Sequence, residues 1–321
     1  MGNSKKTIAF VIGSLTSGGA ERVISTLSNE LIRKYNIIII TLNWVDPFYP
    51  LDPAIKVVAC RQKIKRSKNP IQAFLNNLFF VKRIIYFLKT EKVDVAIGFL
   101  PSINVLTIVA SKYLGIKCII SERNNPIIND APKKKWDFFR NVLYKKADYL
   151  VVQTAPIKSF FDKLVPSERV IILPNPIASE FSEFRQKKTD KENIILNVGR
   201  LTDQKQQDLL IKAFANINND GWKLIIVGDG EKKVYLEGLI SSLNLENKVK
   251  LTGKVNNIHD YYLKSKIFVL TSNFEGFPNV LIEAMYFGLA CISTNCPTGP
   301  SELIIDNTNG FLIEMQNQPA L

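Results

Sequence analysis

The 321-residue sequence is 46% hydrophobic, which is enough apolar material for two domains with real cores. Its net charge of +13 is uneven, because residues 1–180 hold 27 basic and 13 acidic side chains, whereas residues 181–321 hold 15 and 16. No uninterrupted apolar run of about 18 residues occurs, which argues against a transmembrane helix. We expect a soluble, globular protein whose basic first half faces nucleic acid, an anionic membrane, another polyanion or only solvent.

The first 15 residues and the cysteines bear on the cell compartment. Two lysines precede a short apolar run, as in a signal peptide, but no convincing cleavage site follows, so we interpret residues 7–12 as a first strand. The four cysteines, Cys60, Cys118, Cys291 and Cys296, lack the Cys-x2-Cys spacing of a metal site. Reduced thiols in a cytosolic protein fit this pattern best.

In the first half, apolar runs alternate with amphipathic stretches, a rhythm typical of a parallel sheet flanked by helices. Strands are expected over residues 7–12, 37–42, 55–59, 93–98, 117–121 and 149–153. Helices are expected over residues 20–34, 76–89, 104–114 and 135–147. The helix over 76–89 combines many apolar side chains with Lys82, Arg83 and Lys89, and residues 61–68 add five cations. It either lies on an anionic membrane surface or is buried against the sheet.

The polar segment over residues 182–193 is rich in Lys, Asp and Glu, and we interpret it as an interdomain linker. The expected domains are therefore residues 1–181 and 194–321. Strands of the second domain are expected over residues 194–200, 223–227, 249–252, 267–271 and 290–294. The predicted fold class is α/β, with two doubly wound Rossmann-like domains that face a cleft at the carboxyl ends of their strands.

A strand–loop–helix junction in the second half carries two acidic side chains. The apolar residues 267–270 precede Gly276, a helix predicted over 278–286 and Gly288 as its stop. Free N–H groups at the start of such a helix favour an anion. Glu275 and Glu283 could then bind sugar hydroxyls from the loop and from the helix. Alternatively, Glu275 caps the helix and Glu283 is solvated.

Two other strand ends carry groups suited to phosphate. Gly18 and Gly19 separate the first strand from the first helix, where glycine permits close backbone approach, although the pair alone also fits a plain turn. The spacing is not Gly-x-Gly-x-x-Gly, which weakens a dinucleotide interpretation. Arg200 and Lys205 follow the first strand of the second half, and together they suit a diphosphate unless they are ordinary surface cations.

Metal ligands are not evident in the sequence. There is no Asp-x-Asp pair and no His/Cys cluster, so we expect neither a metal nor a cofactor. His259 is the only histidine, and we place it at a helix start without a catalytic role.

Two motifs resemble those of a known family. Residues 275–285 read EGFPNVLIEAM, which resembles the Glu-x7-Glu signature of the retaining glycosyltransferases of family 4, which have the GT-B fold. Residues 199–205 read GRLTDQK, similar to the Gly-Arg-Leu-x-x-x-Lys motif of the same family. The resemblance implies that Arg200 and Lys205 neutralise the leaving nucleoside diphosphate, that Glu283 holds the ribose and that Glu275 holds the transferred sugar. The other donor-binding residues that it implies are Gly18, Gly19, Lys254, Val255, Gly276, Phe277, Pro278 and Asn279.

The sequence also departs from the family pattern. Many members carry a histidine near the sugar in the first domain; here Glu122 or Arg123 stands at that strand end, on the expected acceptor side. Glu302 either closes the site or is a helix-start acid. Members usually continue into helices that cross back to the first domain, whereas this sequence ends at Leu321, so we expect a truncated C-terminal end.

The predicted function is that of a retaining, metal-independent glycosyltransferase. It would move an N-acetylhexosamine or hexose from a nucleotide-sugar, expected to be UDP-linked, to a glycan or polyprenyl-diphosphate-linked acceptor in bacterial surface-glycan, lipopolysaccharide or lipid-linked oligosaccharide synthesis. We expect a cytoplasmic protein, peripheral at the inner face of the membrane, that binds its anionic surface and no nucleic acid. The alternatives are a sugar-nucleotide epimerase of the same fold and a non-enzymatic nucleic-acid-binding protein.

Overall fold

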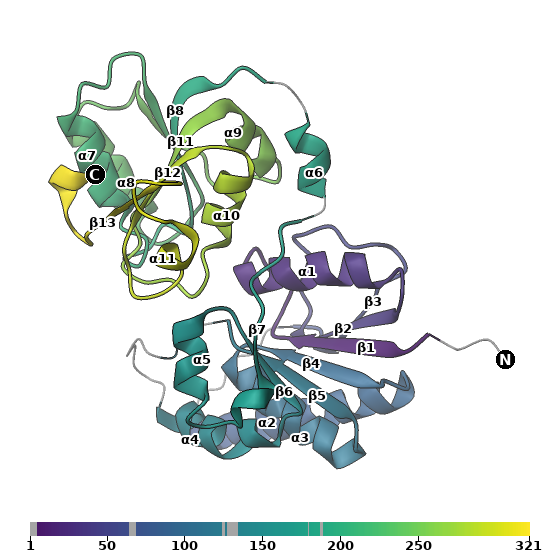
Figure 1. Cartoon of the computed structure of the whole chain (residues 1–321). Coiled ribbons are helices and arrows are strands. Elements are labelled where there is room, and N and C mark those ends of the chain that lie inside the picture. The colour runs from purple at the N-terminus through teal and green to yellow at the C-terminus, as the bar shows by residue number, and fades with distance from the viewer. Residues whose placement is uncertain (1–4, 64–68, 124–125, 127–133, 179, 187–188) are drawn as a thin grey trace. The chain divides into compact units, whose positions relative to one another are not determined.

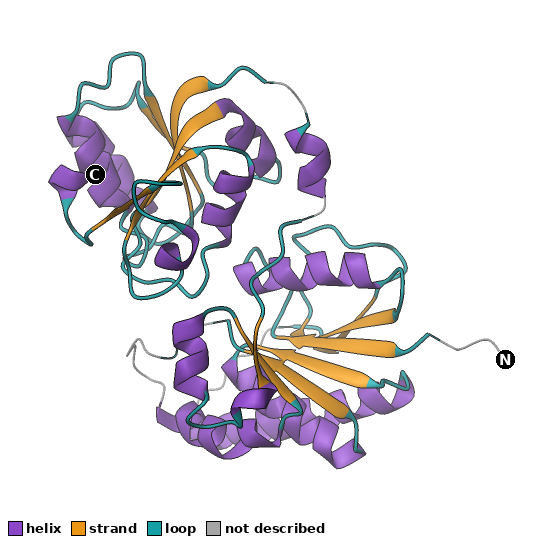
Figure 2. Ribbon diagram, in the orientation of Figure 1, coloured by secondary structure: helices purple, strands orange, loops and turns teal. Residues whose placement is uncertain are grey.

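The computed structural model describes the chain apart from residues 1–4, 64–68, 124–125, 127–133, 179 and 187–188. The described residues form two compact units, which we call the first unit (Met1–Pro176) and the second unit (Ile177–Leu321). Each unit is a parallel sheet with helices on both faces (Figures 1 and 2). Three cations of the basic stretch, Lys65, Arg66 and Lys68, lie outside the described residues.

The first unit is built on a parallel sheet with the strand order β3-β2-β1-β4-β5-β6-β7 in the described part of the chain. Its strands are β1 (Thr7–Ile12), β2 (Asn36–Asn43), β3 (Lys56–Arg61), β4 (Val95–Phe99), β5 (Lys117–Ser121), β6 (Tyr149–Val152) and β7 (Val170–Ile172). The order reverses between β1 and β4, which is the switch point of a doubly wound fold. Such sheets are covered on both faces, which is why their strands are continuous apolar runs.

The helices of the first unit pack against alternate side chains of the same strands. They are α1 (Gly19–Leu31), α2 (Pro70–Thr90), α3 (Pro101–Leu114), α4 (Lys134–Leu143) and α5 (Ala155–Phe161), with 3₁₀ turns at Tyr144–Lys146 and Ser167–Arg169. Phe10 in β1 belongs to a core with Ile24 of α1, whereas its neighbour Val11 belongs to a core with Ile84 of α2. Successive side chains of a strand point to opposite faces, so one strand serves both layers.

The second unit has the strand order β10-β9-β8-β11-β12-β13, the 3-2-1-4-5-6 order of Rossmann folds. Its strands are β8 (Glu192–Val198), β9 (Lys223–Val227), β10 (Val249–Leu251), β11 (Ser265–Leu270), β12 (Ala290–Thr294) and β13 (Phe311–Ile313). Its helices are α6 (Glu180–Arg185), α7 (Gln207–Asn216), α8 (Lys233–Ser242), α9 (Ile258–Lys264), α10 (Asn279–Tyr286) and α11 (Pro300–Leu303), with a 3₁₀ turn at Gln318–Ala320. The switch point lies between β8 and β11.

The division between the units falls earlier than the expected linker at residues 182–193. Ala178 and Phe181 are buried in the core of the second unit. The Phe181 ring lies 5.2 Å from the Phe287 ring and 6.5 Å from the Tyr262 ring, between ring centroids. Helix α6 is thus part of the second unit, because its aromatic side chain gains apolar contacts there.

The predicted fold class and the predicted strands are confirmed, with shifts at element ends. Helix α2 begins at Pro70, six residues before the expected start, because Asn69 caps it by accepting a hydrogen bond from the Gln72 amide at 2.8 Å. The helix expected over residues 135–147 ends as an α-helix at Leu143 and continues as a 3₁₀ turn. His259 lies in the first turn of α9, as expected.

Candidate active site

The two loops with the strongest motifs lie at the switch point of the second unit. The loop with Arg200 and Lys205 follows β8, and the loop with Glu275 follows β11, the neighbouring strand. Backbone and side-chain bonds join the loops: the Asn273 amide donates to the Gln204 carbonyl at 2.8 Å, and Gln204 Nε2 donates to the Phe274 carbonyl at 2.9 Å. The sequence motifs, 70 residues apart, thus form one surface.

Arg200 is exposed, and the backbone on both sides of it packs against the turn after β9. The Leu201 amide donates to the Asp229 carbonyl at 3.1 Å. A Cβ atom at Gly228 would lie 1.9 Å from the Gly199 carbonyl oxygen, and one at Gly230 would lie 2.3 Å from the Leu201 carbonyl oxygen. Both positions require glycine for this close approach.

The guanidinium of Arg200 has no side-chain partner among the described residues. A guanidinium carries five N–H donors in one plane, an arrangement that suits an anion with two acceptor oxygens.

Lys205 and Glu275 form the central ion pair of the site. Lys205 Nζ lies 2.5 Å from Glu275 Oε1, and Ser272 Oγ donates to the same oxygen at 2.6 Å. Both ionic side chains are largely buried, with 14% and 8% of their side-chain surface exposed. A buried carboxylate needs this neutralisation, and the lysine ammonium keeps further donors for a second acceptor.

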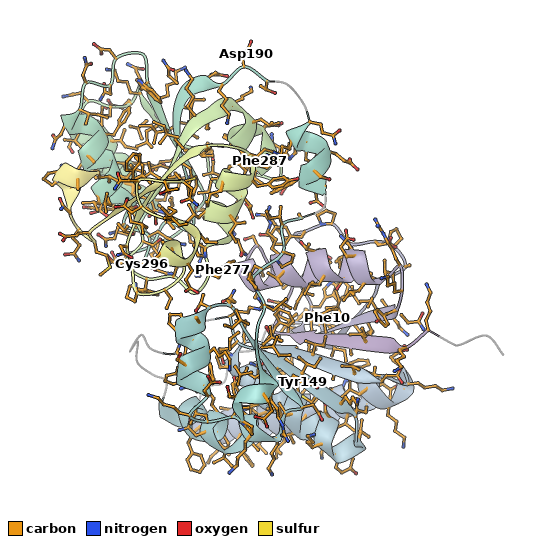
Figure 3. All side chains as sticks on the ribbon, viewed as in Figure 1. Phe10, Tyr149, Asp190, Phe277, Phe287 and Cys296 are labelled. Carbon is orange, nitrogen blue, oxygen red and sulfur yellow. The ribbon has the colours of Figure 1, made fainter. Side chains whose placement is uncertain are left out.

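A third loop supports the Glu275 backbone. Thr298, which follows β12, is buried and donates its hydroxyl to the Glu275 carbonyl oxygen. A Cβ atom at the next residue, Gly299, would lie 2.6 Å from Pro278 Cδ, so the two loops are in contact. Figure 3 shows Phe277 and Cys296 on these loops. Glu302 is exposed in the first turn of α11, which fits the helix-start interpretation.

Glu283 lies inside α10 and is 4% exposed. Tyr262, fully buried on α9, donates its hydroxyl to Glu283 Oε2 at 2.9 Å. The expected helix over 278–286 is confirmed, with Pro278 immediately before its first residue and Gly288 at a φ of +69° after its end. A buried carboxylate oriented by Tyr262 thus lies in the middle of α10, and Glu283 is not the solvated side chain of the alternative interpretation.

The expected base-binding residues follow β10. The Gly228 amide donates to the Gly253 carbonyl at 3.0 Å, which joins this strand end to the turn beneath Arg200. Lys254 is exposed and Val255 is half-buried against the core that contains Tyr262. Arg200, Lys205 and Glu275 therefore share one edge of the sheet with Lys254 and Val255, and Glu283 lies on the helix that follows the Glu275 loop.

In the first unit, Gly18 and Gly19 stand at the start of α1. Gly18 has an extended backbone and Gly19 is the first helical residue. The Glu21 carboxylate folds back toward this loop: Thr16 Oγ1 donates to Glu21 Oε1 at 3.2 Å, and a Cβ atom at Gly18 would lie 2.2 Å from Glu21 Oε2. An acidic side chain is the favourable partner of a helix start. The role of the pair toward a phosphate stays a prediction.

Glu122 and Arg123 follow β5 in the first unit. Glu122 is buried and accepts a hydrogen bond from the Tyr144 hydroxyl at 2.8 Å, while Asn104 Nδ2 donates to Tyr144 Oη at 3.0 Å. Burial, and then the Glu122 carboxylate, raise the pKa of Tyr144 well above its ordinary value, so Tyr144 is a neutral donor. Arg123 lies over the Phe99 ring, with Cζ 4.9 Å from the centroid.

Neither cysteine chemistry nor a metal cluster appears at these sites. The four cysteines are buried and free, and burial raises the pKa of Cys296, on the loop after β12, to about 12. Its thiol is therefore protonated at neutral pH. Within the described ranges, no three His, Cys, Asp or Glu side chains are grouped as metal ligands would be.

Sequence reasoning missed Ser272, Thr298 and Tyr262, the hydroxyl donors that hold the two glutamates. Ser272 opens the stretch before Glu275 and Thr298 opens the segment TGPSE, so both lie within motifs. Tyr262 carries no local signal, because it contacts Glu283 across 21 residues.

Two family descriptions cover nearly the whole chain. "Glycosyltransferase Family 4" matches residues 17–181, and "Glycosyl transferases group 1" matches residues 179–321. The chain is 33% identical, over 98% of its length and 86% of the relative's, to a Campylobacter jejuni protein named "GalNAc-alpha-(1->4)-GalNAc-alpha-(1->3)-diNAcBac-PP-undecaprenol alpha-1,4-N-acetyl-D-galactosaminyltransferase". It is 31% identical, over 97% of its length and 86% of the relative's, to the amylovoran biosynthesis glycosyltransferase AmsD of Erwinia amylovora.

Solved structures show the same fold. The crystal structure of Anabaena HepE in complex with UDP superposes with a TM-score of 0.74 at 19% identity, over 97% of this chain and 86% of that one. The fold, the paired loops at the switch point and the sequence matches agree, and the chain belongs to glycosyltransferase family 4, with two Rossmann-like domains of the GT-B class.

Proposed function

We propose that the protein is a retaining glycosyltransferase that binds a UDP-sugar in its second unit. The observation that carries this proposal is the pair of cations at the switch point: Arg200, with an open guanidinium, beside Lys205, which neutralises Glu275 at 2.5 Å. A diphosphate leaving group develops negative charge as its bond to the sugar breaks, and oriented cations stabilise it. The crystal structure of Anabaena HepE is described as a complex with UDP, which supports UDP as the nucleotide of the donor.

The residues present suit separate parts of such a donor. Arg200 and Lys205 would bind the diphosphate, and Glu283, held by Tyr262, would accept hydrogen bonds from the ribose hydroxyls. Glu275 and the backbone of Gly276 would hold the transferred sugar. If the departing diphosphate is stabilised in this way, the acceptor hydroxyl attacks from the same face, and no separate strong base is required.

For the acceptor, we propose a polyprenyl-diphosphate-linked glycan at the inner face of the cytoplasmic membrane. The support is the name of the Campylobacter jejuni relative, which describes transfer onto an undecaprenol-diphosphate glycan. More distant relatives are named lipopolysaccharide galactosyltransferases. Because the relatives differ in the sugar that they transfer, the donor screen below identifies the sugar of this protein.

The test is a donor screen. Purified protein is incubated with UDP-, GDP- and ADP-linked hexoses and N-acetylhexosamines, and released nucleoside diphosphate is measured with and without an undecaprenyl-diphosphate-linked glycan. Faster release from a UDP-sugar supports the proposal, and an α-linked product from an α-linked donor, read by NMR, supports retention. Release from a GDP- or ADP-sugar alone would contradict the choice of UDP, and a β-linked product would contradict retention.

Transfer is expected to survive a chelator. Arg200 and Lys205 supply the positive charge that a divalent cation would otherwise bring to the diphosphate. Turnover of the UDP-sugar in excess EDTA should therefore match turnover in untreated buffer. Loss of activity with EDTA that Mg²⁺ or Mn²⁺ restores would contradict metal independence.

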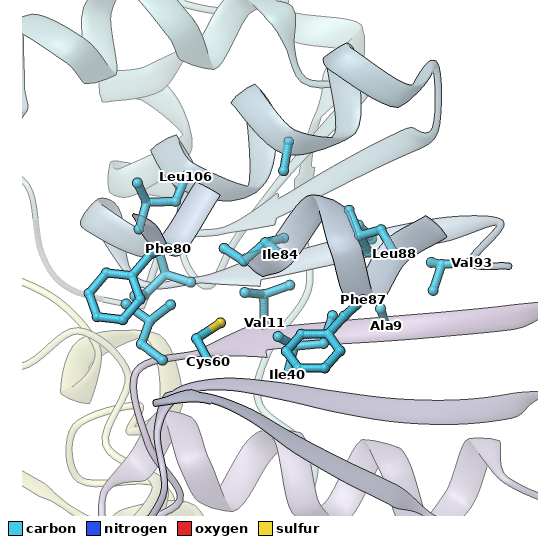
Figure 4. Packing of buried hydrophobic residues seen from close by; sticks show 14 of the residues in the cluster. Ala9, Val11, Ile40, Cys60, Phe80, Ile84, Phe87, Leu88, Val93 and Leu106 are labelled. Atoms are coloured by element: carbon cyan, nitrogen blue, oxygen red, sulfur yellow. The ribbon is translucent and has the colours of Figure 1, made fainter. Parts of the chain in front are cut away.

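We also propose that α2 brings the first unit to an anionic membrane surface. One face of the C-terminal half of α2 is buried, and Figure 4 shows Phe80, Ile84, Phe87 and Leu88 packed toward the sheet. Its N-terminal half differs, because Phe74 is 62% exposed. The other exposed apolar side chains of this half are Ile71, Leu75, Leu78 and Phe79.

The cations around this surface strengthen the proposal. Lys63, Lys82 and Lys89 are exposed, and each cation near an anionic membrane contributes about 1 kcal/mol. By length and composition α2 would also pass as a membrane-crossing helix, but core helices pass the same test, and here one half of the helix packs on the sheet.

Flotation with liposomes tests the membrane proposal. At low salt the protein should float with vesicles that contain phosphatidylglycerol and remain behind with phosphatidylcholine alone, and salt should weaken recovery because exposed charges are screened. The double variant Lys63→Glu/Lys82→Glu should lose recovery. Val234→Ser, which changes an exposed apolar residue of α8 in the second unit, is the matched control and should float normally. Equal recovery on neutral and anionic vesicles would remove the electrostatic argument.

A further inference from the structure

The loop after β8 lies at the surface, yet each of its backbone carbonyls from Arg200 to Lys205 accepts a hydrogen bond from the protein. The donors are Gln207 Nε2 for Arg200 at 2.9 Å, the Lys232 amide for Leu201 at 3.0 Å, the Lys205 amide for Thr202 at 3.1 Å, Gln206 Nε2 for Asp203 at 2.8 Å, the Asn273 amide for Gln204 at 2.8 Å and Thr271 Oγ1 for Lys205 at 2.8 Å. Surface carbonyls can be left to water. Here the protein supplies each partner, so the path of this backbone is fixed.

A strained residue marks the end of the same loop. Gln206 has φ of +50° and ψ of 43°, a left-handed conformation that residues other than glycine rarely adopt. Such strain persists only where the surrounding contacts determine the conformation. The chain therefore turns at a fixed point between Lys205 and the first residue of α7.

Two of the donors to this loop are buried side chains, and they hold the carbonyls of the two cations. Thr271 follows β11 and Gln207 is the first residue of α7, and each is 1% exposed. A carbonyl only accepts, so Thr271 presents its hydroxyl hydrogen and Gln207 presents its NH₂ group. Because both donors are buried, the loss of either one leaves a carbonyl without its partner.

The fixed carbonyls bear on where the cationic side chains can reach. Lys205 is held at both ends, because its carbonyl accepts from Thr271 and its ammonium lies 2.5 Å from Glu275 Oε1. Arg200 is held at its backbone by Gln207. Charge stabilisation in a transition state depends on groups that are oriented in advance, and a shift of about 1 Å in such a group can cost 10²-fold in rate.

We propose that Thr271 and Gln207 are positioning residues of the transfer reaction, Thr271 acting through Lys205 and Gln207 acting through Arg200. This inference rests on the proposed function, which assigns the two cations to the diphosphate of the donor. Neither Thr271 nor Gln207 contacts the diphosphate in this proposal. Each one fixes the backbone from which a cation reaches it.

The experiment removes each donor in three backgrounds. Thr271→Val and Gln207→Met remove a donor at similar side-chain volume, and each is made in the wild type, in Lys205→Ala and in Arg200→Ala. For every protein, kcat is measured with the nucleotide-sugar that the donor screen selects, and the melting temperature is measured in parallel. A residue that acts through one cation loses its effect on kcat when that cation is absent.

Thr271→Val should lower kcat about three- to tenfold in the wild type, the effect of one ordinary hydrogen bond. It should cause the same loss in Arg200→Ala, but less than a twofold loss in Lys205→Ala. Gln207→Met should show the mirror pattern, with its loss retained in Lys205→Ala and absent in Arg200→Ala. Thr271→Ser keeps the hydroxyl, so its kcat should remain within twofold of the wild-type value.

The matched control is Thr107→Val in the first unit. Thr107 is fully buried on α3, and its hydroxyl donates to the Ile103 carbonyl at 2.8 Å, so the variant loses the same kind of hydrogen bond. It should lower the melting temperature and leave kcat unchanged. A variant at Thr271 or Gln207 that does not fold is replaced by alanine at the same position, for which the same pattern across the backgrounds is expected.

Two results would overturn the inference. One is a kcat within twofold of the wild type in both Thr271→Val and Gln207→Met. The other is a loss of equal size in all three backgrounds, which would mean that these residues support the fold and not a particular cation. A wild type that turns over no nucleotide-sugar in the donor screen would instead contradict the proposed function itself.

Discussion

The variants Arg200→Ala and Lys205→Ala should each turn over the UDP-sugar roughly 10²- to 10³-fold more slowly than the wild type. This is the loss expected for one oriented group that stabilises transition-state charge. Arg200 is exposed, and its backbone is held by the close approach of Gly228 and Gly230, so its loss removes a cation at a fixed place in the loop after β8. Lys205 is also the ionic partner of Glu275, so Lys205→Ala leaves a buried carboxylate beside the diphosphate. Steady-state kinetics with the selected UDP-sugar measures both losses.

The matched control for these variants is Lys212→Ala. Lys212 lies on α7 with its side chain exposed, and its ammonium lies 3.6 Å from Asp208, an i,i+4 pair of small energetic value. Its removal should leave turnover near normal. Near-normal turnover in both Arg200→Ala and Lys205→Ala, with unchanged melting temperatures, would show that the assignment of the cations is wrong.

Glu283→Ala should weaken UDP binding by roughly 10- to 150-fold for each ribose bond lost, since a hydrogen bond to a charged group contributes about 1.5–3 kcal/mol. Tyr262→Phe should weaken it less, by about three- to tenfold, because it removes only the 2.9 Å bond that orients the carboxylate. Glu275→Ala should instead reduce transfer, with a smaller change in UDP affinity. Calorimetry with UDP and steady-state transfer separate these effects.

Tyr261→Phe is the control for Tyr262→Phe, because it removes a hydroxyl from the same helix, and no hydrogen bond of that hydroxyl is found in the described part of the chain. It should bind UDP as the wild type does. The opposite pattern, with Glu275→Ala losing UDP affinity and Glu283→Ala losing only transfer, would mean that the two roles are reversed.

The strands were predictable because parallel strands that are buried on both faces have continuous apolar sequences. The strands over residues 117–121, 223–227 and 290–294 coincide with β5, β9 and β12. Helix α6 was not predictable in the same way, because EFSEFR has little periodicity, and only tertiary contact of Phe181 with Phe287 explains why it folds onto the second unit.

The candidate site was predictable where its residues lie together in sequence. Arg200 and Lys205 share one motif, and Glu275 and Glu283 share another, and the sheet order brings the two motifs to neighbouring strand ends. The supporting contacts were not predictable, because Tyr262 and Thr298 meet their glutamates through packing between separate elements.

The net charge of the first half could not decide between partners. An excess of cations over residues 1–180 suits nucleic acid, a membrane or a polyanion alike. Family membership favours a glycosyltransferase over a nucleic-acid-binding protein. The exposed apolar half of α2 supports a membrane surface in a way that no charge count could.

A crystal structure of the protein with UDP tests the central claim most directly. We predict that the diphosphate lies within hydrogen-bond distance of Arg200 and Lys205, with the ribose hydroxyls on the Glu283 carboxylate and the uracil against the backbone at Lys254 and Val255. UDP bound elsewhere on the molecule, with these side chains unchanged, would contradict the account.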